Sequence, residues 1–415
     1  MQTTPKSMRL QIGIFGRTNV GKSSFLNMVA GQDVAITSPV PGTTTDVVEK
    51  PMELLPVGPV VFLDTAGVDD VSVLSAERIK RASLVFDRAD VFVLITADGV
   101  WEEYEEMICQ QAKKRSLAVI VVCNKIDLGH PTEMFCQKVK EAGAEIVLCS
   151  SVEMQKREEY VTNFKSTLIE SLPEEHFRPP AIIGDLVPPG GLAVLIVPID
   201  LQAPKGRLIL PQVQTIRDAL DSDAAVMVVK EREYLSALSL LSGKPDLVVC
   251  DSQVVQKMVA DTPKDVPCTT FSILFARLKG DLVGAAKGAA AIERLKKGDR
   301  VLVAESCTHH AAEDDIGRVK IPRWLRQFTG ADIAIDVCSG RDYPEDLHNY
   351  SLVIHCGGCM ITRREMLSRV SKAETKDVPV TNYGVAISHL QGVIKRVLEP
   401  FPAALFAYNA ERERV

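Results

Sequence analysis

Short apolar runs alternate with amphipathic stretches along the first 172 residues of the chain. Five such runs end at polar or glycine-containing turns: LQIGIFG, PVVFLDT, DVFVLIT, LAVIVVCN and EIVLCSS. Strands of a parallel sheet are apolar on both faces, and the helices between them carry an apolar stripe of period 3.6. The pattern therefore predicts a doubly wound α/β domain over residues 1–174.

Two smaller α/β domains are expected after it. The segment SLPEEHFRPPAIIGDLVPPGG contains five prolines and predicts a linker. Apolar runs at LAVLIVPI, AAVMVV and DLVVC, with helical patterns over 211–221 and 231–241, then predict a domain over 180–272. A third domain, 276–415, follows from DLVGAAKGAAAIERLKK, RVLVAES, IAIDVCSG, LVIHCGG and a final helix through AISHLQGVIKRVLE.

Composition and charge limit the class of protein, the partners and the cellular compartment that can be expected. The chain has 415 residues, of which 46% are hydrophobic and 25% charged, as expected for a globular protein of several domains. The net charge of -6 gives no general attraction to phosphate backbones, so no nucleic-acid partner is expected. No apolar run approaches the ~20 residues that span a bilayer, and no signal peptide is recognised. We expect a cytoplasmic protein, in which clustered cysteines are metal ligands or redox groups rather than disulfides.

A glycine-rich loop follows the first predicted strand. It reads GRTNVGKSS and places Gly16, Gly21, Lys22 and Ser23 at the spacing of a phosphate-binding loop, just before a helical pattern. Glycines let backbone N–H groups approach phosphates, and the helix start adds a favourable dipole. Lys22 is expected to reach the β- and γ-phosphates, and Ser23, next to Ser24, to bind Mg²⁺. The alternative is a glycine-rich turn with a surface lysine.

Two further motifs select the nucleotide. FLDTAGVD places Asp64 at a strand end, where it could hold Mg²⁺, and Gly67 where its N–H could contact the γ-phosphate. VVCNKID supplies Asn124, Lys125 and Asp127 after another strand. A carboxylate at 127 can accept both N1–H and N2–H of guanine, whereas adenine offers no such pair of donors. GTP is therefore expected rather than ATP.

Two shorter segments are expected to complete the nucleotide site. PGTTTD, residues 41–46, fits a first switch in which Thr44 closes over Mg²⁺ and the γ-phosphate, with Thr43 a weaker candidate. LCSS places Ser150 and Ser151 where a base-contacting loop should lie, with Ser-Ser in place of the usual Ser-Ala. The predicted catalytic residues are Lys22, Thr44, Asp64 and Gly67.

These motifs resemble the translation-factor-related GTPases, and most of all the Era-like and tRNA-modification GTPases. The resemblance implies an α/β fold with an N-terminal P-loop GTPase domain, followed by the two smaller α/β domains. The residue after Asp-x-x-Gly is Val68, which cannot orient water as glutamine does in many regulatory GTPases, so slow hydrolysis is expected. In tRNA-modification GTPases an asparagine matching Asn19 helps to hold K⁺; the alternative is a turn residue.

Cysteines and histidines gather after two strands of the third domain. ESCTHH provides Cys307 and His309, and VIHCGGC provides His355, Cys356 and Cys359. Strand ends of an open α/β sheet share one edge, so these side chains can converge there. These residues could form a tetrahedral zinc site or bind a 4Fe–4S cluster with one exchangeable position. The alternatives are a redox-active cysteine pair and a site that binds no metal.

The combination of these features over all three domains resembles the FeFe-hydrogenase maturation GTPases, the HydF family. The resemblance implies a homodimer formed by the middle domain and a 4Fe–4S cluster in the last. It also implies a scaffold or carrier that delivers the 2Fe subcluster precursor to the FeFe-hydrogenase apoprotein, with radical-SAM maturases as further partners.

Carried onto this sequence, the resemblance makes Cys307, Cys356 and Cys359 the cluster ligands. His309 and His355 match histidines that are either a fourth ligand or groups that hold the ligands in place. An alternative from another class is a ribosome- or RNA-associated GTPase with structural zinc in its C-terminal domain. The acidic balance and the aromatic content of only 5% argue against that alternative.

Overall fold

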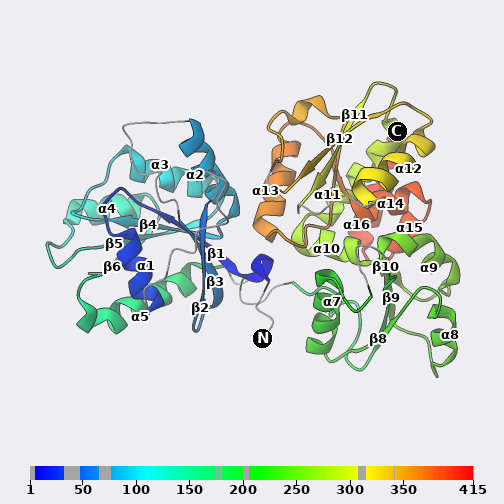
Figure 1. Cartoon of the computed structure of the whole chain (residues 1–415), viewed down its shortest axis with the longest axis horizontal. Helices are drawn as coiled ribbons and strands as arrows, with labels where there is room; N and C mark the ends of the chain where they lie inside the picture. Colours follow the sequence, from blue (N-terminus) through cyan, green and yellow to red (C-terminus); the bar gives the residue numbers. More distant parts are fainter. Residues whose placement is uncertain are drawn as a thin grey trace. The chain divides into compact units, whose positions relative to one another are not determined.

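The computed structural model divides the chain into two compact units, Met1–Pro179 and Pro180–Val415, which are described separately (Figure 1). It describes residues 5–31, 47–64, 76–173, 176, 180–199, 205–306, 315–340 and 342–414, and of 76–81 the backbone alone. Within these ranges, no helix is both long and apolar enough to cross a membrane. The α/β fold expected from the sequence is confirmed in both units.

The first unit is a six-stranded sheet in the order β2-β3-β1-β4-β5-β6. All neighbouring pairs are parallel except β2 and β3. The strands are β1 (Leu10–Phe15), β2 (Val48–Leu54), β3 (Gly58–Asp64), β4 (Val91–Thr96), β5 (Ala118–Cys123) and β6 (Glu145–Leu148). The helices are α1 (Lys22–Ala30), α2 (Ala76–Arg88), α3 (Glu103–Lys114), α4 (Glu133–Glu141) and α5 (Arg157–Ser171).

Two cores form on the two faces of this sheet, because side chains alternate along each strand. In β4, Val91, Val93 and Ile95 belong to one core, whereas Phe92 and Leu94 belong to the other. All five predicted strands are confirmed. The antiparallel edge strand β2 was not predicted, since its sequence VEKPMEL has no apolar run.

The second unit contains two four-stranded parallel sheets, ordered β10-β9-β7-β8 and β12-β11-β13-β14. Their strands are β7 (Leu192–Ile196), β8 (Ala225–Val229), β9 (Leu247–Cys250), β10 (Cys268–Thr270), β11 (Arg300–Glu305), β12 (Ala334–Ser339), β13 (Leu352–His355) and β14 (Val380–Asn382). The helices are α7 (Leu210–Asp221), α8 (Tyr234–Ser239), α9 (Val255–Asp261), α10 (Phe271–Lys279), α11 (Leu282–Ala290), α12 (Ile321–Thr329), α13 (Arg363–Glu374), α14 (Tyr383–Leu390), α15 (Ile394–Leu398) and α16 (Pro402–Arg412). One hydrophobic core includes residues of both sheets.

The end of the chain differs from the single final helix that the sequence predicted. The structure has three helices there, α14, α15 and α16. Gly392, with φ of 73°, lies between the first two, in the left-handed conformation that ends helices. The three-residue strands β10 and β14 were also not predicted, because so short a run carries no periodicity.

Candidate functional site

The predicted phosphate loop connects β1 to α1, and Lys22 is the first residue of that helix. Gly16 and Gly21 have φ of 147° and 94°, and a Cβ at these positions would collide with the Ile95 carbonyl oxygen and the Asn124 amide, respectively. Both positions therefore need glycine. The Lys22 ammonium is buried under the loop and donates to the carbonyl oxygens of Gly16, at 2.7 Å, and Arg17, at 2.9 Å.

The residues expected around Mg²⁺ are described only in part. Ser23 and Ser24 lie exposed in the first turn of α1. Asp64 ends β3 and is buried, and its Oδ2 lies 3.3 Å from the ammonium of Lys50, a residue that sequence reasoning missed. The remaining expected positions, Thr43, Thr44, Gly67 and Val68, lie outside the described residues.

Arg17 ties the phosphate loop to helix α3. Its guanidinium forms two hydrogen bonds to the Glu105 carboxylate, of 2.8 and 2.9 Å, and an ion pair of 2.9 Å with Glu102. The Gly16 N–H donates to the hydroxyl of Tyr104 at 3.2 Å. The hydrogen bond to Glu105 and the neighbouring carboxylates raise the pKa of Arg17. No local sequence pattern indicates this contact, because acidic residues are common at any helix start.

The base-recognition residues are brought together by loops after β5 and β6. The Asn124 side chain donates to the Val20 carbonyl at 2.8 Å and accepts from both the N–H and the hydroxyl of Ser151, at 3.0 Å each. The hydroxyl of Ser150 donates to Asp127 Oδ1 at 2.5 Å. The N–H that Ser151 donates to Asn124 is a backbone group, which any residue at this position would supply. Ser-Ser in place of the usual Ser-Ala is therefore compatible with a base-binding site.

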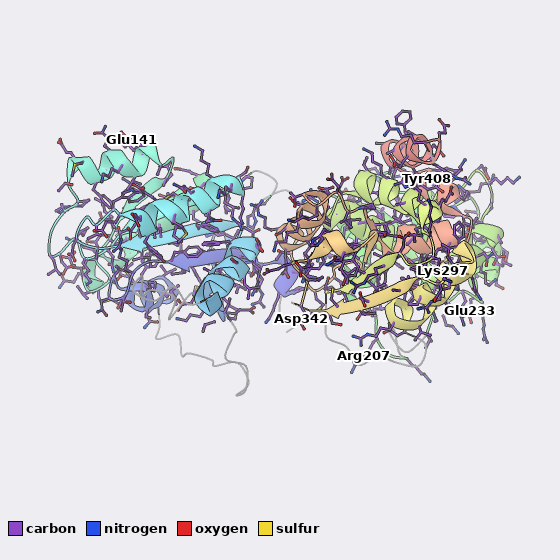
Figure 2. The ribbon with its side chains drawn as sticks, turned by 90° about the horizontal axis from the view of Figure 1, so that it is seen from above. Glu141, Arg207, Glu233, Lys297, Asp342 and Tyr408 are labelled. Carbon is purple, nitrogen blue, oxygen red and sulfur yellow. The ribbon has the colours of Figure 1, made fainter. Side chains whose placement is uncertain are left out.

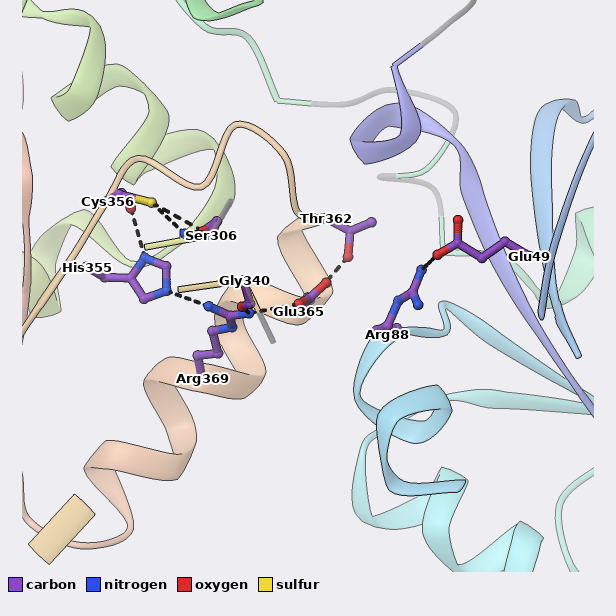
Figure 3. A network of polar contacts seen from close by, with 9 residues as sticks. All are labelled: Glu49, Arg88, Ser306, Gly340, His355, Cys356, Thr362, Glu365 and Arg369. Atoms are coloured by element: carbon purple, nitrogen blue, oxygen red, sulfur yellow. Dashed lines mark hydrogen bonds and ion pairs between the residues drawn. The ribbon is translucent and has the colours of Figure 1, made fainter. Parts of the chain in front are cut away.

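In the second unit, Cys356 follows β13 directly (Figure 3). Its N–H donates to the Ala304 carbonyl of the neighbouring strand β11 at 2.8 Å. Its Sγ accepts from the Ser306 N–H at 3.1 Å and lies 3.3 Å from the Ser306 hydroxyl oxygen. Ser306, the residue before Cys307 in the sequence, therefore lies beside Cys356 at the ends of the adjacent strands β11 and β13.

The loop from Cys356 to Cys359 contains a left-handed backbone conformation at Gly358. Gly358 has φ of 63°, and a Cβ there would collide with the Met366 side chain. Both cysteines are half-buried. Burial and the nearby Cys356 raise the pKa of the Cys359 thiol, whereas Lys279 lowers it. Two thiols on a short loop at a sheet edge fit the soft-donor chemistry of zinc or an iron–sulfur cluster.

His355 is buried, and both of its ring nitrogens are in contact with protein groups (Figure 3). Nδ1 lies 2.9 Å from the Cys356 carbonyl oxygen, and Nε2 lies 3.3 Å from Nη1 of Arg369. Arg369 also donates to the carbonyl of Gly340 at 2.6 Å. Burial and the neighbouring guanidinium lower the pKa of His355 to about 4. A neutral ring that donates from Nδ1 suits a role in holding the Cys356 backbone.

Cys307 and His309 lie outside the described residues. Within the described part of the chain, no three His, Cys, Asp or Glu side chains gather as a metal site. A cavity of about 230 Å³ borders His355, Cys356 and Gly357. The seven cysteines not predicted as ligands are all free. Burial raises the pKa of several, such as Cys109 and Cys268 to about 11, as expected for thiols that serve as small apolar side chains.

Comparison with protein families divides the chain into three matched segments. Residues 11–125 match a family described as 50S ribosome-binding GTPase. Residues 182–280 match the hydrogen maturase F dimerization domain, and residues 283–400 match the hydrogen maturase F tetramerization domain. The first unit is thus a GTPase domain, and the second combines two oligomerization domains.

Individual relatives match the GTPase domain. The tRNA modification GTPase MnmE of Synechocystis is 43% identical over 126 residues, which are 29% of this chain and 26% of the relative. This chain thus spans about a quarter of the length of the curated relatives it matches. Among solved structures, the G domain of the T. maritima FeoB iron transporter is 20% identical with a TM-score of 0.30, covering 38% of this chain and 99% of that domain. Aquifex aeolicus Era is 21% identical with a TM-score of 0.32, covering 56% of this chain and 98% of Era.

Proposed function

Because this chain belongs to the hydrogen maturase F family, we propose that it is a GTP-hydrolysing iron–sulfur scaffold of FeFe-hydrogenase maturation. It holds a 4Fe–4S cluster through Cys307, Cys356 and Cys359 and delivers the 2Fe subcluster precursor to the hydrogenase apoprotein. The single observation that carries this proposal is the contact between the Cys356 thiol and Ser306. Ser306 precedes Cys307 in the chain, and it lies within hydrogen-bond distance of Cys356, the second proposed ligand. Cys356 follows β13, which pairs with β11.

The residues of the second unit have separate roles in this proposal. The thiolates of Cys307, Cys356 and Cys359 would hold the cluster, which would supply one exchangeable position for an incoming ligand. His355 fixes the carbonyl of Cys356, and Arg369 fixes the ring of His355. His309 and His355 are the predicted candidates for the fourth position, and we favour His309 because both ring nitrogens of His355 are in contact with protein groups. Radical-SAM maturases are the expected source of the precursor.

In the GTPase domain, Lys22 and the phosphate loop hold the phosphates, and Ser23, Thr44 and Asp64 hold Mg²⁺. Asp127, fixed by Ser150, selects guanine. We propose slow hydrolysis that K⁺ accelerates through Asn19. The dimerization match supports a homodimer formed by residues of the predicted middle domain, 180–272. The matches of residues 182–280 and 283–400 to maturase domains favour this function over a zinc-stabilised RNA-associated GTPase.

Anaerobic purification tests the proposal. The protein is expected to be brown and to contain about four irons per chain. Cys307→Ser, Cys356→Ser or Cys359→Ser should each remove most of the iron and abolish activation of an apo-hydrogenase. Cys338→Ser is the matched control, because Cys338 is a free, half-buried cysteine of strand β12, which pairs with β11 in the same sheet. His309→Ala should keep most iron but change the electron paramagnetic resonance signal. A colourless protein with stoichiometric zinc would contradict the proposal.

A further inference from the structure

Lys279 contacts the loop between β13 and α13, residues 356–362, which contains Cys356 and Cys359. It was not predicted as a site residue. It is the last residue of α10, and its side chain is only 4% exposed. Its ammonium donates to three carbonyl oxygens of one loop: Gly358 at 3.1 Å, Cys359 at 3.2 Å and Ile361 at 2.8 Å. An ammonium has three N–H donors, so the whole hydrogen-bonding capacity of this residue is directed at the loop.

Hydrogen bonds between the end of α10 and the region of the loop are donated from both sides. Arg363, at the start of α13, donates from Nη1 to the carbonyls of Leu278, at 2.7 Å, and Gly280, at 3.3 Å. These carbonyls lie at the end of α10, where a helix has no internal donors for them. A lysine from the helix thus holds the loop, and an arginine from beyond the loop holds the helix end.

A buried ammonium is costly unless anions lie nearby. Among the described residues, no carboxylate forms an ion pair with Lys279. An apolar side chain could fill the same space without this desolvation cost. The ammonium therefore matches a loop that gains negative charge when its two cysteines are thiolates.

We propose that Lys279 is the positioning residue of the metal centre, which holds the Cys356–Cys359 loop in its chelating shape and places a positive charge beside its thiolates. This inference rests on the proposed role of these cysteines as cluster ligands. The loop contains Gly357 and Gly358, and such a segment loses much conformational freedom when it is ordered. The hydrogen bonds of Lys279 and Arg363 order the loop in the folded protein. The loop therefore loses this conformational entropy on folding rather than on metal binding. Lys279 lies within the dimerization match, whereas the loop lies within the tetramerization match, so the site requires both segments.

The test compares full-length protein carrying Lys279→Met or Lys279→Gln with wild type. Methionine removes both the charge and the donors, whereas glutamine removes the charge and keeps an amide donor. Lys297→Met is the control, because Lys297 is an exposed lysine of the same unit (Figure 2). Three quantities are measured: Co²⁺ affinity from the thiolate-to-metal absorption band, iron content after anaerobic reconstitution, and the reduction potential of the bound cluster. Circular dichroism and GDP affinity check the fold.

Lys279→Met is expected to weaken Co²⁺ binding about 10–100-fold, the range typical for groups that hold metal ligands in place. Its cluster should have a more negative reduction potential, because loss of a nearby positive charge disfavours the added electron. Lys279→Gln should show the same potential shift with a smaller loss of affinity, and it decides the matter if Lys279→Met does not fold. Unchanged Co²⁺ affinity and unchanged reduction potential in a folded Lys279 variant would refute the proposed role of Lys279, but not the metal centre itself. A wild-type protein that binds neither Co²⁺ nor iron would refute the metal centre as well.

Discussion

Lys50 and Asp64 form an ion pair inside the GTPase domain, with Nζ and Oδ2 3.3 Å apart and side chains only 6% and 4% exposed. Lys50 lies on β2 and Asp64 ends β3, and these strands pair antiparallel. Asp64 is also the carboxylate expected to hold Mg²⁺. The lysine and the metal would therefore act on one carboxylate, and the ammonium supplies positive charge to Asp64 in the absence of a metal.

Lys50→Met should destabilise the nucleotide-free GTPase domain by up to about 3 kcal/mol, because it breaks a buried ion pair. The loss should shrink when Mg²⁺ and GDP are bound, since the metal then supplies positive charge to the carboxylate. Chemical denaturation with and without Mg²⁺ and GDP measures both values, and Lys138→Met, at an exposed position of α4, is the control. A loss of the same size in both states would show that Lys50 and the metal act independently.

Ser150→Ala should weaken GDP binding about tenfold or more, because Asp127 loses the hydroxyl that orients its carboxylate. Ser151→Ala should have a much smaller effect. Asn124 accepts from both the N–H and the hydroxyl of Ser151, and alanine retains the N–H. Fluorescent GDP titrations of the two variants give the comparison directly. Equal losses in affinity would mean that the hydroxyl of Ser151, rather than its backbone, positions Asn124.

The motifs that could be predicted are those whose function depends on local spacing. The phosphate loop, Asn124 and Asp127 each follow a buried strand, and a strand of a parallel sheet is recognisable from its apolar run. The structure places them together because β1, β4 and β5 are neighbours. In the same way, β11 and β13 are adjacent, which brings Ser306 to Cys356.

The residues that sequence reasoning missed act through contacts between distant positions. Lys279 reaches carbonyls about 80 residues away, and Arg17 binds Glu105 across 88 positions. A lysine in the last turn of a helix normally complements the helix dipole in solvent, so nothing local distinguishes Lys279. Lys50 lies on an edge strand whose alternation of polar and apolar residues is weak. Burial of such cations depends on the packing of other elements, which has no periodic signature.

Potassium should accelerate GTP hydrolysis relative to sodium at equal ionic strength, because Val68 cannot orient water and Asn19 is the residue proposed to hold the cation. Asn19 has φ of 67°, so alanine there would strain the loop. Asn19→Gly is the better variant, since glycine tolerates this conformation and removes only the side chain. It should abolish the difference between KCl and NaCl while retaining GDP binding. Equal wild-type rates in the two salts would contradict potassium activation.

His389 should make the second unit less stable below about pH 6.5. It is buried in α14, and its Nδ1 lies 2.9 Å from the hydroxyl of Tyr408 on α16. Its Nε2 has no hydrogen-bond partner among the described residues and lies 4.0 Å from Glu293. Burial, as the largest cause, and Arg412 lower the pKa of His389 to about 4, against the opposing effect of Glu293.

The sign of the pH dependence follows from this lowered pKa. Between about pH 6.5 and 4 the unfolded chain binds a proton at this histidine and the folded chain does not, so stability falls as the pH falls. The full difference is on the order of 3 kcal/mol. Denaturation of wild type and His389→Gln at pH 7.5 and pH 5 isolates this contribution, because carboxylates and His355 titrate alike in both proteins. The variant should lose less stability than wild type between the two values. Equal losses would mean that His389 is protonated in the folded state.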